Sequence, residues 1–320
     1  MTGLDEPLGA ERSELLSRLD RLVAVRRMSK RERLRNFPLA TLRNSFKMRL
    51  ATLYSSWLGG YLTPTVDTVF RERMTLIVPP LGDIWIYGAD IDTDPEVRLT
   101  RFLIRHLKAG EVFFDLGANL GYYSLLACKL AGAAGSVYAF EPSPFLLPLL
   151  KDNLRGKPNA HAVGKAISDS AGVARFFIAP LPYIGTSSLR PDWQQGTKPV
   201  EVETVSLDDY CRSQAMSPTF LKIDVEGIED RVIAGSSGML RKGSPVIALE
   251  VIFNPIQEAY RKALRLLQEL GYRPLAIQDD GGLRPLEYGG IDAYLEELGR
   301  RYKLVHDAPN DFENLIFQRL

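Results

Sequence analysis

The sequence is poor in the residues that form cross-links or bind zinc. Its 320 residues include two cysteines, Cys128 and Cys211, and three histidines. These numbers are too small for a disulfide framework or for a Cys/His zinc site. Disulfide-stapled secreted scaffolds and structural zinc modules are therefore excluded.

Long apolar runs and a strong net charge are absent as well. No stretch approaches the ~20 uncharged residues that span a bilayer, and the acidic first residues lack the apolar segment of a secretory signal. We therefore expect a cytoplasmic protein, with the inner face of the membrane as the alternative. Forty basic and 39 acidic residues give a net charge of +1, so the whole chain offers no electrostatic case for nucleic-acid binding.

The charge that is present is unevenly distributed. Residues 1–60 carry 12 basic and 6 acidic side chains, and the remainder carries 28 and 33. Apolar residues recur at helical spacing over residues 10–35, and a second apolar and basic stretch follows over residues 37–57. We expect residues 1–65 to form a basic helical extension. It either packs on the main domain or a second subunit, or residues 10–57 make peripheral contact with an anionic membrane.

Beyond this extension, residues 66–91 predict two or three short strands, and helices alternate with strands from residue 94 onward. The predicted strands are 112–116, 136–141, 161–167, 220–225, 246–251, 273–277 and 314–319. The predicted helices are 96–108, 121–131, 144–154, 228–240 and 256–270. Repeated βα units with apolar strands predict an α/β fold with a doubly wound, mostly parallel sheet. Because no clear helix separates the last two strands, one of them is expected to run antiparallel at an edge.

The segment from Asp115 to Gly121 ends the first of these strands and opens a helix, which is where doubly wound sheets bind nucleotides. Glu141 ends the next strand, 26 residues after Asp115, and its carboxylate can accept both hydroxyls of a ribose. Asn119 replaces the glycine that a pyrophosphate requires. An acid before Gly117 suits a cationic ligand, so we expect S-adenosylmethionine, with Asp115 near its ammonium and sulfonium.

Three segments resemble FkbM-type S-adenosylmethionine-dependent methyltransferases: DLGANLGYYS at 115–124, AFEPS at 139–143 and LKIDVEGIE at 221–229. The resemblance implies a class I methyltransferase-like, Rossmann-like sheet of seven strands with an antiparallel last strand. It also implies acceptors such as sugars of glycans or glycolipids, or hydroxyls of natural products. We expect the methyltransferase domain to span residues 66–320. Its cofactor half is expected at 94–178, and its acceptor-side segments at 179–199 and 279–310.

The cofactor contacts predicted from these segments include Ser168 and Asp169, which the resemblance places near the adenine. The alternative for Asp169 is a turn residue. The full predicted set is Asp115, Gly117, Ala118, Asn119, Gly121, Tyr122, Glu141, Pro142, Ser168, Asp169 and Asp224. In the acceptor-side segment, Tyr183 and Trp193 either stack on a sugar or pack within the loop.

A second group of charged residues lies in and after a strand of the buried type. Regular alternation would put Lys222, Asp224 and Glu226 on one side of that strand, and Glu250 ends the next strand. We predict these four as catalytic. Asp224 or Glu226 would act as the base for a hydroxyl acceptor, or the acids would hold a divalent metal. The alternative for Lys222 and Asp224 is an ion pair that only braces the sheet.

The sequence therefore predicts a methyltransferase that uses S-adenosylmethionine and methylates a hydroxyl oxygen of a small-molecule or glycan acceptor. The alternatives are a NAD-dependent oxidoreductase, disfavoured by Asn119, and a non-catalytic nucleotide-binding protein. Nucleic acid is not expected as a partner, because the chain after residue 60 is net acidic. Homo-oligomer formation stays open.

Overall fold

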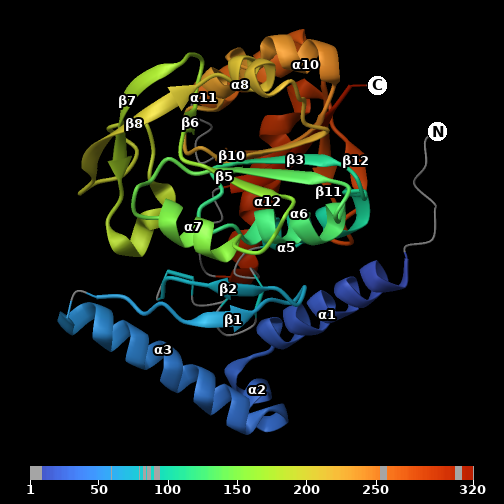
Figure 1. The fold of residues 1–320 in the computed structure, drawn as a ribbon. Coiled ribbons are helices and arrows are strands. Elements are labelled where there is room, and N and C mark those ends of the chain that lie inside the picture. Colours follow the sequence, from blue (N-terminus) through green and yellow to red (C-terminus); the bar gives the residue numbers. More distant parts are fainter. Residues whose placement is uncertain are drawn as a thin grey trace. The chain divides into compact units, whose positions relative to one another are not determined.

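The structure is a computed structural model that describes residues 9–58, 60–78, 80, 81, 84, 88, 89, 94–252, 258–306 and 312–319. The chain forms two compact units, residues 1–106 and residues 107–320, both drawn in Figure 1. The domain boundary predicted after residue 65 stays a prediction. Within the described residues, each helix is too short or too polar to span a bilayer.

In the first unit, α1 (Ala10–Arg27) packs with its apolar stripe inward, as its spacing predicts. The buried residues of α1 are Leu15, Leu16, Leu19 and Val23. Polar contacts join it to α5 (Asp94–His106). Arg12 Nη1 donates to the carbonyl of Ile104 at 2.6 Å, and Asp20 pairs with Arg101 at 2.6 Å. The stripe and these contacts together fix α1 against α5.

The helix predicted over residues 10–35 is interrupted, because Ser29 starts a new one. The Ser29 hydroxyl accepts the backbone N–H of Glu32 at 3.2 Å, and the Glu32 carboxylate accepts the N–H of Ser29 at 2.7 Å. This reciprocal capping box begins α2 (Lys30–Asn36), which α3 (Pro38–Leu58) follows. Two short antiparallel strands, β1 (Thr65–Asp67) and β2 (Arg73–Thr75), confirm the strands predicted within 66–91.

The second unit is built on an eight-stranded sheet in the order β12-β11-β13-β10-β9-β3-β4-β5. Its strands are β3 (Val112–Leu116), β4 (Ser136–Phe140), β5 (Ala160–Val163), β9 (Phe220–Ile223), β10 (Val246–Ile252), β11 (Arg273–Ile277), β12 (Leu283–Pro285) and β13 (Phe312–Gln318). The five neighbouring strands β10, β9, β3, β4 and β5 run parallel to one another. Strand β13 runs antiparallel to both of its neighbours, β10 and β11. This order confirms the doubly wound, class I methyltransferase-like α/β fold.

Three details of that prediction are wrong. The sheet has eight strands because β12 forms a hairpin with β11. The antiparallel strand β13 lies inside the sheet, between β10 and β11, and not at an edge. A helix, α12 (Ile291–His306), does precede β13, and Ile291 and Leu295 in its first part are buried. Residues 307–310 of the predicted acceptor-side segment lie outside the described residues.

A separate three-stranded sheet, β6-β8-β7, was not predicted. The strand expected over 161–167 is divided between β5 and β6 (Ala166–Ile167), which belong to different sheets. β8 (Lys198–Val205) pairs parallel with β6 and antiparallel with β7 (Gly172–Ile178). The segment between β7 and β8 was expected as a loop, and it contains a short 3-10 helix, η1 (Leu181–Thr186).

Helices cover both faces of the main sheet (Figure 1). On one face lie α6 (Tyr122–Ala131) and α7 (Leu147–Asn153), and on the other lie α8 (Leu207–Gln214), α10 (Ser237–Gly243) and α11 (Glu258–Glu269). The helix predicted over 228–240 is two helices, α9 (Glu229–Ala234) and α10.

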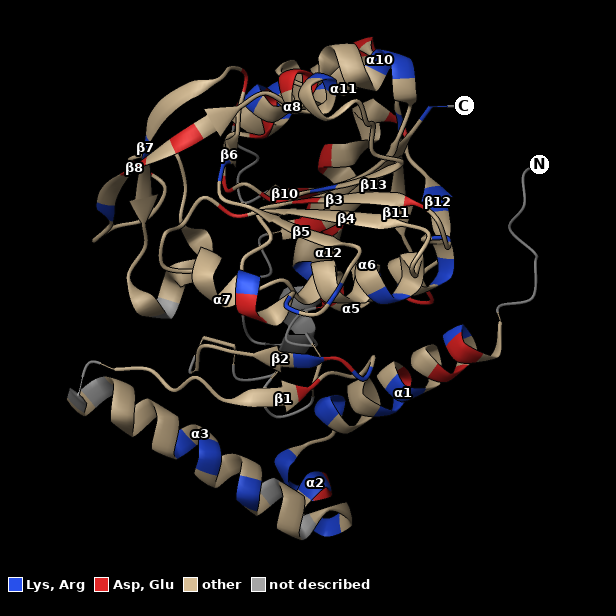
Figure 2. Cartoon of the chain, in the orientation of Figure 1, with Lys and Arg blue, Asp and Glu red and all other residues tan. Residues whose placement is uncertain are grey.

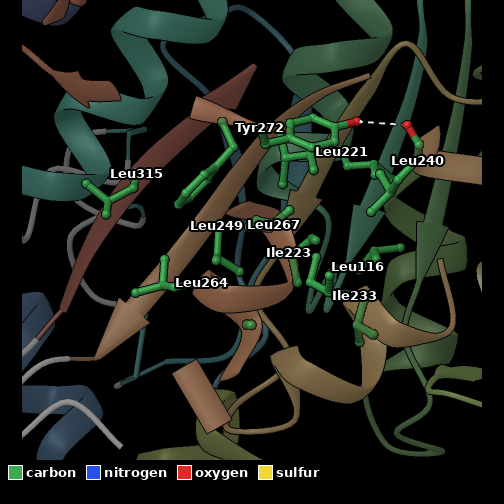
Figure 3. Close-up of a cluster of buried hydrophobic side chains, with 14 of the residues drawn as sticks. Leu116, Leu221, Ile223, Ile233, Leu240, Leu249, Leu264, Leu267, Tyr272 and Leu315 are labelled. Carbon is green, nitrogen blue, oxygen red and sulfur yellow. Dashed lines mark hydrogen bonds between the residues drawn. The ribbon is translucent and has the colours of Figure 1, made fainter. Parts of the chain in front are cut away.

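The main core lies between the sheet and the helices α8, α10 and α11 that cover one of its faces (Figure 3). Strand register aligns Leu116, Ile223, Leu249 and Leu315 in one row across four strands. All four are fully buried, and Tyr272 closes the cluster by donating its hydroxyl to the carbonyl of Leu240 at 3.5 Å. Since side chains alternate between faces, the residues next to this row point to the opposite face.

Candidate active site

The row next to this apolar row puts two charges side by side. Asp115 of β3 is the register partner of Lys222 of β9, and both are almost fully buried. Lys222 Nζ lies 3.9 Å from Asp115 Oδ1, and Ser124 of α6 donates its hydroxyl to Asp115 Oδ2 at 2.6 Å. Buried charges are stable only when paired, so these three side chains stabilise one another.

Lys222 also reaches past the end of its strand. Its Nζ lies 2.8 Å from Asp224 Oδ2 and 5.2 Å from the centre of the Tyr123 ring. Burial raises the pKa of Asp115, while Lys222 and the Ser124 hydrogen bond act in the opposite direction. Among the described residues, Asp115 Oδ1 has no hydrogen-bond partner. The lysine therefore connects the buried aspartate to the loop that follows β9.

The glycine turn after β3 packs directly against this loop. Gly117 has φ +83°, and a Cβ there would lie 1.8 Å from the carbonyl oxygen of Asp224. The N–H groups of Gly117 and Ala118 donate to the carbonyl of Phe140 at 3.1 and 2.9 Å. Both the left-handed backbone and the close approach require glycine at position 117.

Glu141 anchors the other side of the turn. Its Oε2 accepts the N–H of Asn119 and its Oε1 accepts the N–H of Ser143, both at 2.9 Å. Burial raises the pKa of Glu141 to about 7. Each carboxylate oxygen has a second lone pair, so Glu141 retains the capacity to accept ligand hydroxyls.

The regular alternation predicted through residue 226 ends early, because β9 stops at Ile223. Glu226 and Gly227 have φ +60° and +94°, and this left-handed pair turns the chain into α9. The turn still brings the acids together. One carboxylate oxygen each of Asp224, Glu226 and Glu250 lies within 4.8 Å of the others.

Two residues that the sequence analysis did not link to this group hold Glu226 in place. Trp193 Nε1 donates to Glu226 Oε2 at 2.7 Å, and the Ser188 hydroxyl donates to the Glu226 carbonyl at 2.5 Å. Burial and the charge of Asp224 raise the pKa of Glu226 well above its usual value. Trp193 and Ser188 therefore hold the loop of residues 224–227, which we call the acid loop. The Arg190 guanidinium lies 5.3 Å from the centre of the Trp193 ring.

Two further buried groups lie beside the acids. Glu229, at the start of α9, accepts the N–H of Gly227 at 3.1 Å, and burial raises its pKa to about 7. Tyr260 of α11 is fully buried, and its hydroxyl has no hydrogen-bond partner among the described residues. Burial raises the pKa of Tyr260, and the charges of Glu229, Glu250 and Glu226 add to that effect.

A cavity opens at the carboxyl ends of β3, β4 and β9, where doubly wound folds bind ligands. Six predicted site residues line it: Gly117, Asn119, Glu141, Pro142, Asp224 and Glu226. Eight others are not among its described lining residues: Asp115, Ala118, Gly121, Tyr122, Ser168, Asp169, Lys222 and Glu250. The cavity is thus lined by the glycine turn, the end of β4 and the acid loop.

Ser168 and Asp169 lie just beyond the cavity wall. Ser168 is buried and donates its N–H to the carbonyl of Val205 at 3.0 Å. Asp169 pairs with Arg231 at 3.0 Å, and that hydrogen bond lowers the pKa of Asp169. Their neighbours Ala166 and Ile167 line the cavity instead.

Other lining residues lie in or next to β6, β7 and η1. They are Lys165, Phe176, Ile184, Gly185, Ser187 and Leu189. The short apolar run at 176–178 is the one local signal that could have located Phe176, whereas no local pattern marks the others.

The lining fits a nucleoside with a cationic end better than a dinucleotide. Apolar side chains such as Phe140 and Phe176 suit a base, and Glu141 suits a ribose. Lys165 is the sole basic residue among the described lining residues, against Glu141, Asp224 and Glu226. A pyrophosphate would meet repulsion from these acids.

A family model described as the methyltransferase FkbM domain matches residues 115–274, which is half of the chain. The chain belongs to the FkbM methyltransferase family. It is accordingly an S-adenosylmethionine-dependent methyltransferase, as the three sequence segments predicted.

Curated relatives of this FkbM-family chain carry methyltransferase names. It is 26% identical to the hexuronic acid methyltransferase AglP of Haloferax volcanii, over 59% of this chain and 75% of that protein. It is 28% identical to the 31-O-demethyl-FK506 methyltransferase FkbM of Streptomyces tacrolimicus, over 58% of this chain and 82% of that protein. The 2-O-methyltransferase NoeI of Sinorhizobium fredii is 28% identical, over 42% of this chain and 61% of that protein.

Among solved structures, the chain is similar to an FkbM methyltransferase from Methylobacillus flagellatus. The identity is 14% and the TM-score 0.36, over 65% of this chain and 43% of that one.

A second, more polar depression adjoins the cavity of this FkbM-family protein. The two share Leu189 and Ile228. The charged residues that line the depression are Arg190, Asp192, Asp230, Arg231, Glu258 and Lys262. A polar molecule in this depression would therefore lie next to the acid loop.

The contact between the glycine turn and the acid loop predicts a specific cost for Gly117→Ala. The matched control is Gly110→Ala, because Gly110 has the same φ of +83° but nothing within 4 Å of the added Cβ. Both variants bear the left-handed strain of roughly 1 kcal/mol, and only Gly117→Ala must also displace the Asp224 carbonyl. We expect Gly117→Ala to lower the free energy of unfolding by at least about 2 kcal/mol more than the control, measured by chemical denaturation. Equal losses in the two variants would refute the contact.

Proposed function

We propose that the protein transfers the methyl group of S-adenosylmethionine to a hydroxyl oxygen of a sugar, glycan, glycolipid or natural product. The observation that carries this proposal is the carboxylate cluster of Asp224, Glu226 and Glu250, since a hydroxyl acceptor must lose a proton. Asp224 and Glu226 line the cavity, and Glu250 is buried beside them. The names of two relatives, which specify 31-O and 2-O positions, support an oxygen acceptor.

Residues that line the cavity would hold the cofactor. Glu141 would accept the ribose hydroxyls, and Asp224 would face the cationic end, with Gly117, Asn119 and Pro142 shaping the turn. Asp115 would contribute indirectly: its ion pair orients Lys222, and Lys222 in turn orients Asp224. When bound, S-adenosylmethionine supplies a methyl group on a sulfonium that is ready for in-line displacement.

Of the acids, Glu226 is the best candidate for the general base. Its raised pKa brings it toward the working pH, which suits proton transfer. Trp193 occupies Oε2, so Oε1 is the oxygen offered to the acceptor. Glu226 would take up the proton that the acceptor hydroxyl releases as its oxygen bonds to the methyl group.

A divalent cation is the second candidate for this role. Carboxylate oxygens are the ligands that Mg²⁺ and Ca²⁺ prefer, and those of Asp224, Glu226 and Glu250 are close enough to share an ion. However, Lys222 already neutralises Asp224, and Trp193 already holds one oxygen of Glu226. These contacts favour the base over the metal.

The polar depression next to the cavity supports a hydroxyl-rich acceptor. Its mixed charges, including Arg190 and Asp230, offer donors and acceptors for sugar hydroxyls. Tyr183 of η1 is 56% exposed, and its ring remains open for stacking on a sugar.

The cofactor assignment is tested by titration calorimetry. We expect binding of S-adenosylmethionine and of its demethylated product, and none of NAD. Affinity should fall as the pH drops from 8 to 6, because Glu141, with a pKa of about 7, takes up a proton and loses acceptor capacity. Glu141→Gln should bind at least about tenfold more weakly and should lose the part of the pH dependence that Glu141 causes.

The exposed Glu269→Gln is the control for that titration, because it makes the same charge change on the surface and should bind as the unmodified protein does. Binding of NAD without S-adenosylmethionine would favour the oxidoreductase alternative.

The acceptor class is tested by incubating cell extract with methyl-labelled cofactor. We expect label in polysaccharide, glycolipid or small hydroxylated products, and none in nucleic acid. Asp224→Asn and Glu226→Gln should each abolish the label. Labelling that survives both substitutions would contradict the roles of these acids.

The base and the metal are distinguished with Trp193→Phe. Loss of the indole donor raises the pKa of Glu226 further, so the acidic limb of the kcat/KM profile should move up by about one pH unit or more. A chelator should have no effect if Glu226 is the base. An unmoved limb together with loss of activity in chelator, restored by Mg²⁺, would establish the metal instead.

A further inference from the structure

The helix α3 exposes its apolar side chains. Large apolar residues recur every three or four positions along it, and we call them the α3 stripe: Leu39, Leu42, Phe46, Leu50, Leu53 and Trp57. Leu39, Phe46 and Trp57 are 82%, 68% and 83% exposed, and the other three exceed half. This spacing places all six on one side of the helix.

The opposite side of α3 is the more buried one, although its residues are mostly small or polar. Ala51 is buried, and Asn44, Ser45 and Ser55 are half-buried, as is the one large apolar residue of this side, Met48. A helix that only covers a core shows the reverse arrangement, with its apolar stripe inward. Large contiguous apolar surface on a folded protein marks an interaction site.

Basic residues flank the α3 stripe. Arg43, Lys47 and Arg49 lie at its margins, and α3 has no acidic residue, as Figure 2 shows. Residues 30–58, which make up α2 and α3, contain seven basic side chains and one acidic side chain, Glu32. The surface that surrounds the stripe is therefore strongly positive.

We propose that the α3 stripe binds the surface of an anionic lipid bilayer. An interfacial helix buries its apolar face at the boundary of headgroups and acyl chains, while Lys and Arg extend to the headgroups. The charge argues against a second copy as the occupant, because two identical positive surfaces would repel. The binding proposed is peripheral and lies in the plane of the membrane.

This inference does not depend on the methyl acceptor, because α3 and the cavity belong to different units. A failed vesicle experiment would leave cofactor binding intact, and a failed cofactor titration would leave vesicle binding intact.

The experiment is flotation of the full chain with vesicles of phosphatidylcholine alone or with about 30% phosphatidylglycerol added. We expect binding to the anionic vesicles that weakens as salt is raised. Phe46→Ser with Trp57→Ser should reduce the partition at least about tenfold. Arg43→Gln with Arg49→Gln should reduce it about fivefold for each charge.

The control is Val173→Ser, which removes an apolar residue that is 68% exposed on β7 and should leave flotation unchanged. A blue shift of tryptophan fluorescence on binding should disappear in Trp57→Phe while flotation persists. Failure to float with anionic vesicles, flotation that ignores the stripe substitutions, or a dimer in light scattering that Phe46→Ser with Trp57→Ser dissociates would each overturn the proposal.

Discussion

The contact between Asp115 and Lys222 constrains the centre of the second unit. Two buried charges in neighbouring strands cost desolvation free energy that only each other, the Ser124 hydroxyl and Asp224 offset. The register that makes this pair also makes the apolar row through Leu116, Ile223 and Leu249 on the other face. A slip of one residue would exchange the faces and move the charges into the core. Register, core and site thus depend on the same pairing.

From that pair, negative charge accumulates toward the cavity. Lys222 pairs with both Asp115 and Asp224, and the further acids Glu226 and Glu229 follow within five residues. The raised pKa values of Glu226 and Glu229 express this imbalance, because burial and mutual repulsion favour the neutral acids. A cationic ligand would also reduce the repulsion among these carboxylates, by adding positive charge instead of a proton. The arrangement therefore couples ligand charge to the protonation of the acid loop, and this coupling suits a sulfonium cofactor better than a phosphate.

Local patterns predicted the parts of this site that adjoin one another in sequence. The turn from Asp115 to Gly121 and the strand end at Glu141 follow from strand length and glycine spacing, and the structure has both where expected. The contacts of Ser188 and Trp193 with Glu226 span more than 30 residues, and no periodicity encodes them. The β6-β8-β7 sheet was not predicted for a related reason. Its strands are half-exposed or very short, so apolar and polar residues alternate only weakly along them. The interior position of β13 is likewise a property of the whole sheet.

The helices of the first unit mark a different limit of sequence patterns. Both α1 and α3 have apolar residues at helical spacing, yet α1 buries its stripe and α3 exposes its own. Periodicity gives the direction of an apolar face within a helix, and tertiary packing decides whether that face meets a core. In α3 the packed side is mostly small and polar, so packing within the unit does not account for the apolar residues of the α3 stripe. The α3 stripe is exposed within its unit, and basic residues surround it. A surface that is apolar beneath an anionic layer would bury the stripe and pair with these charges.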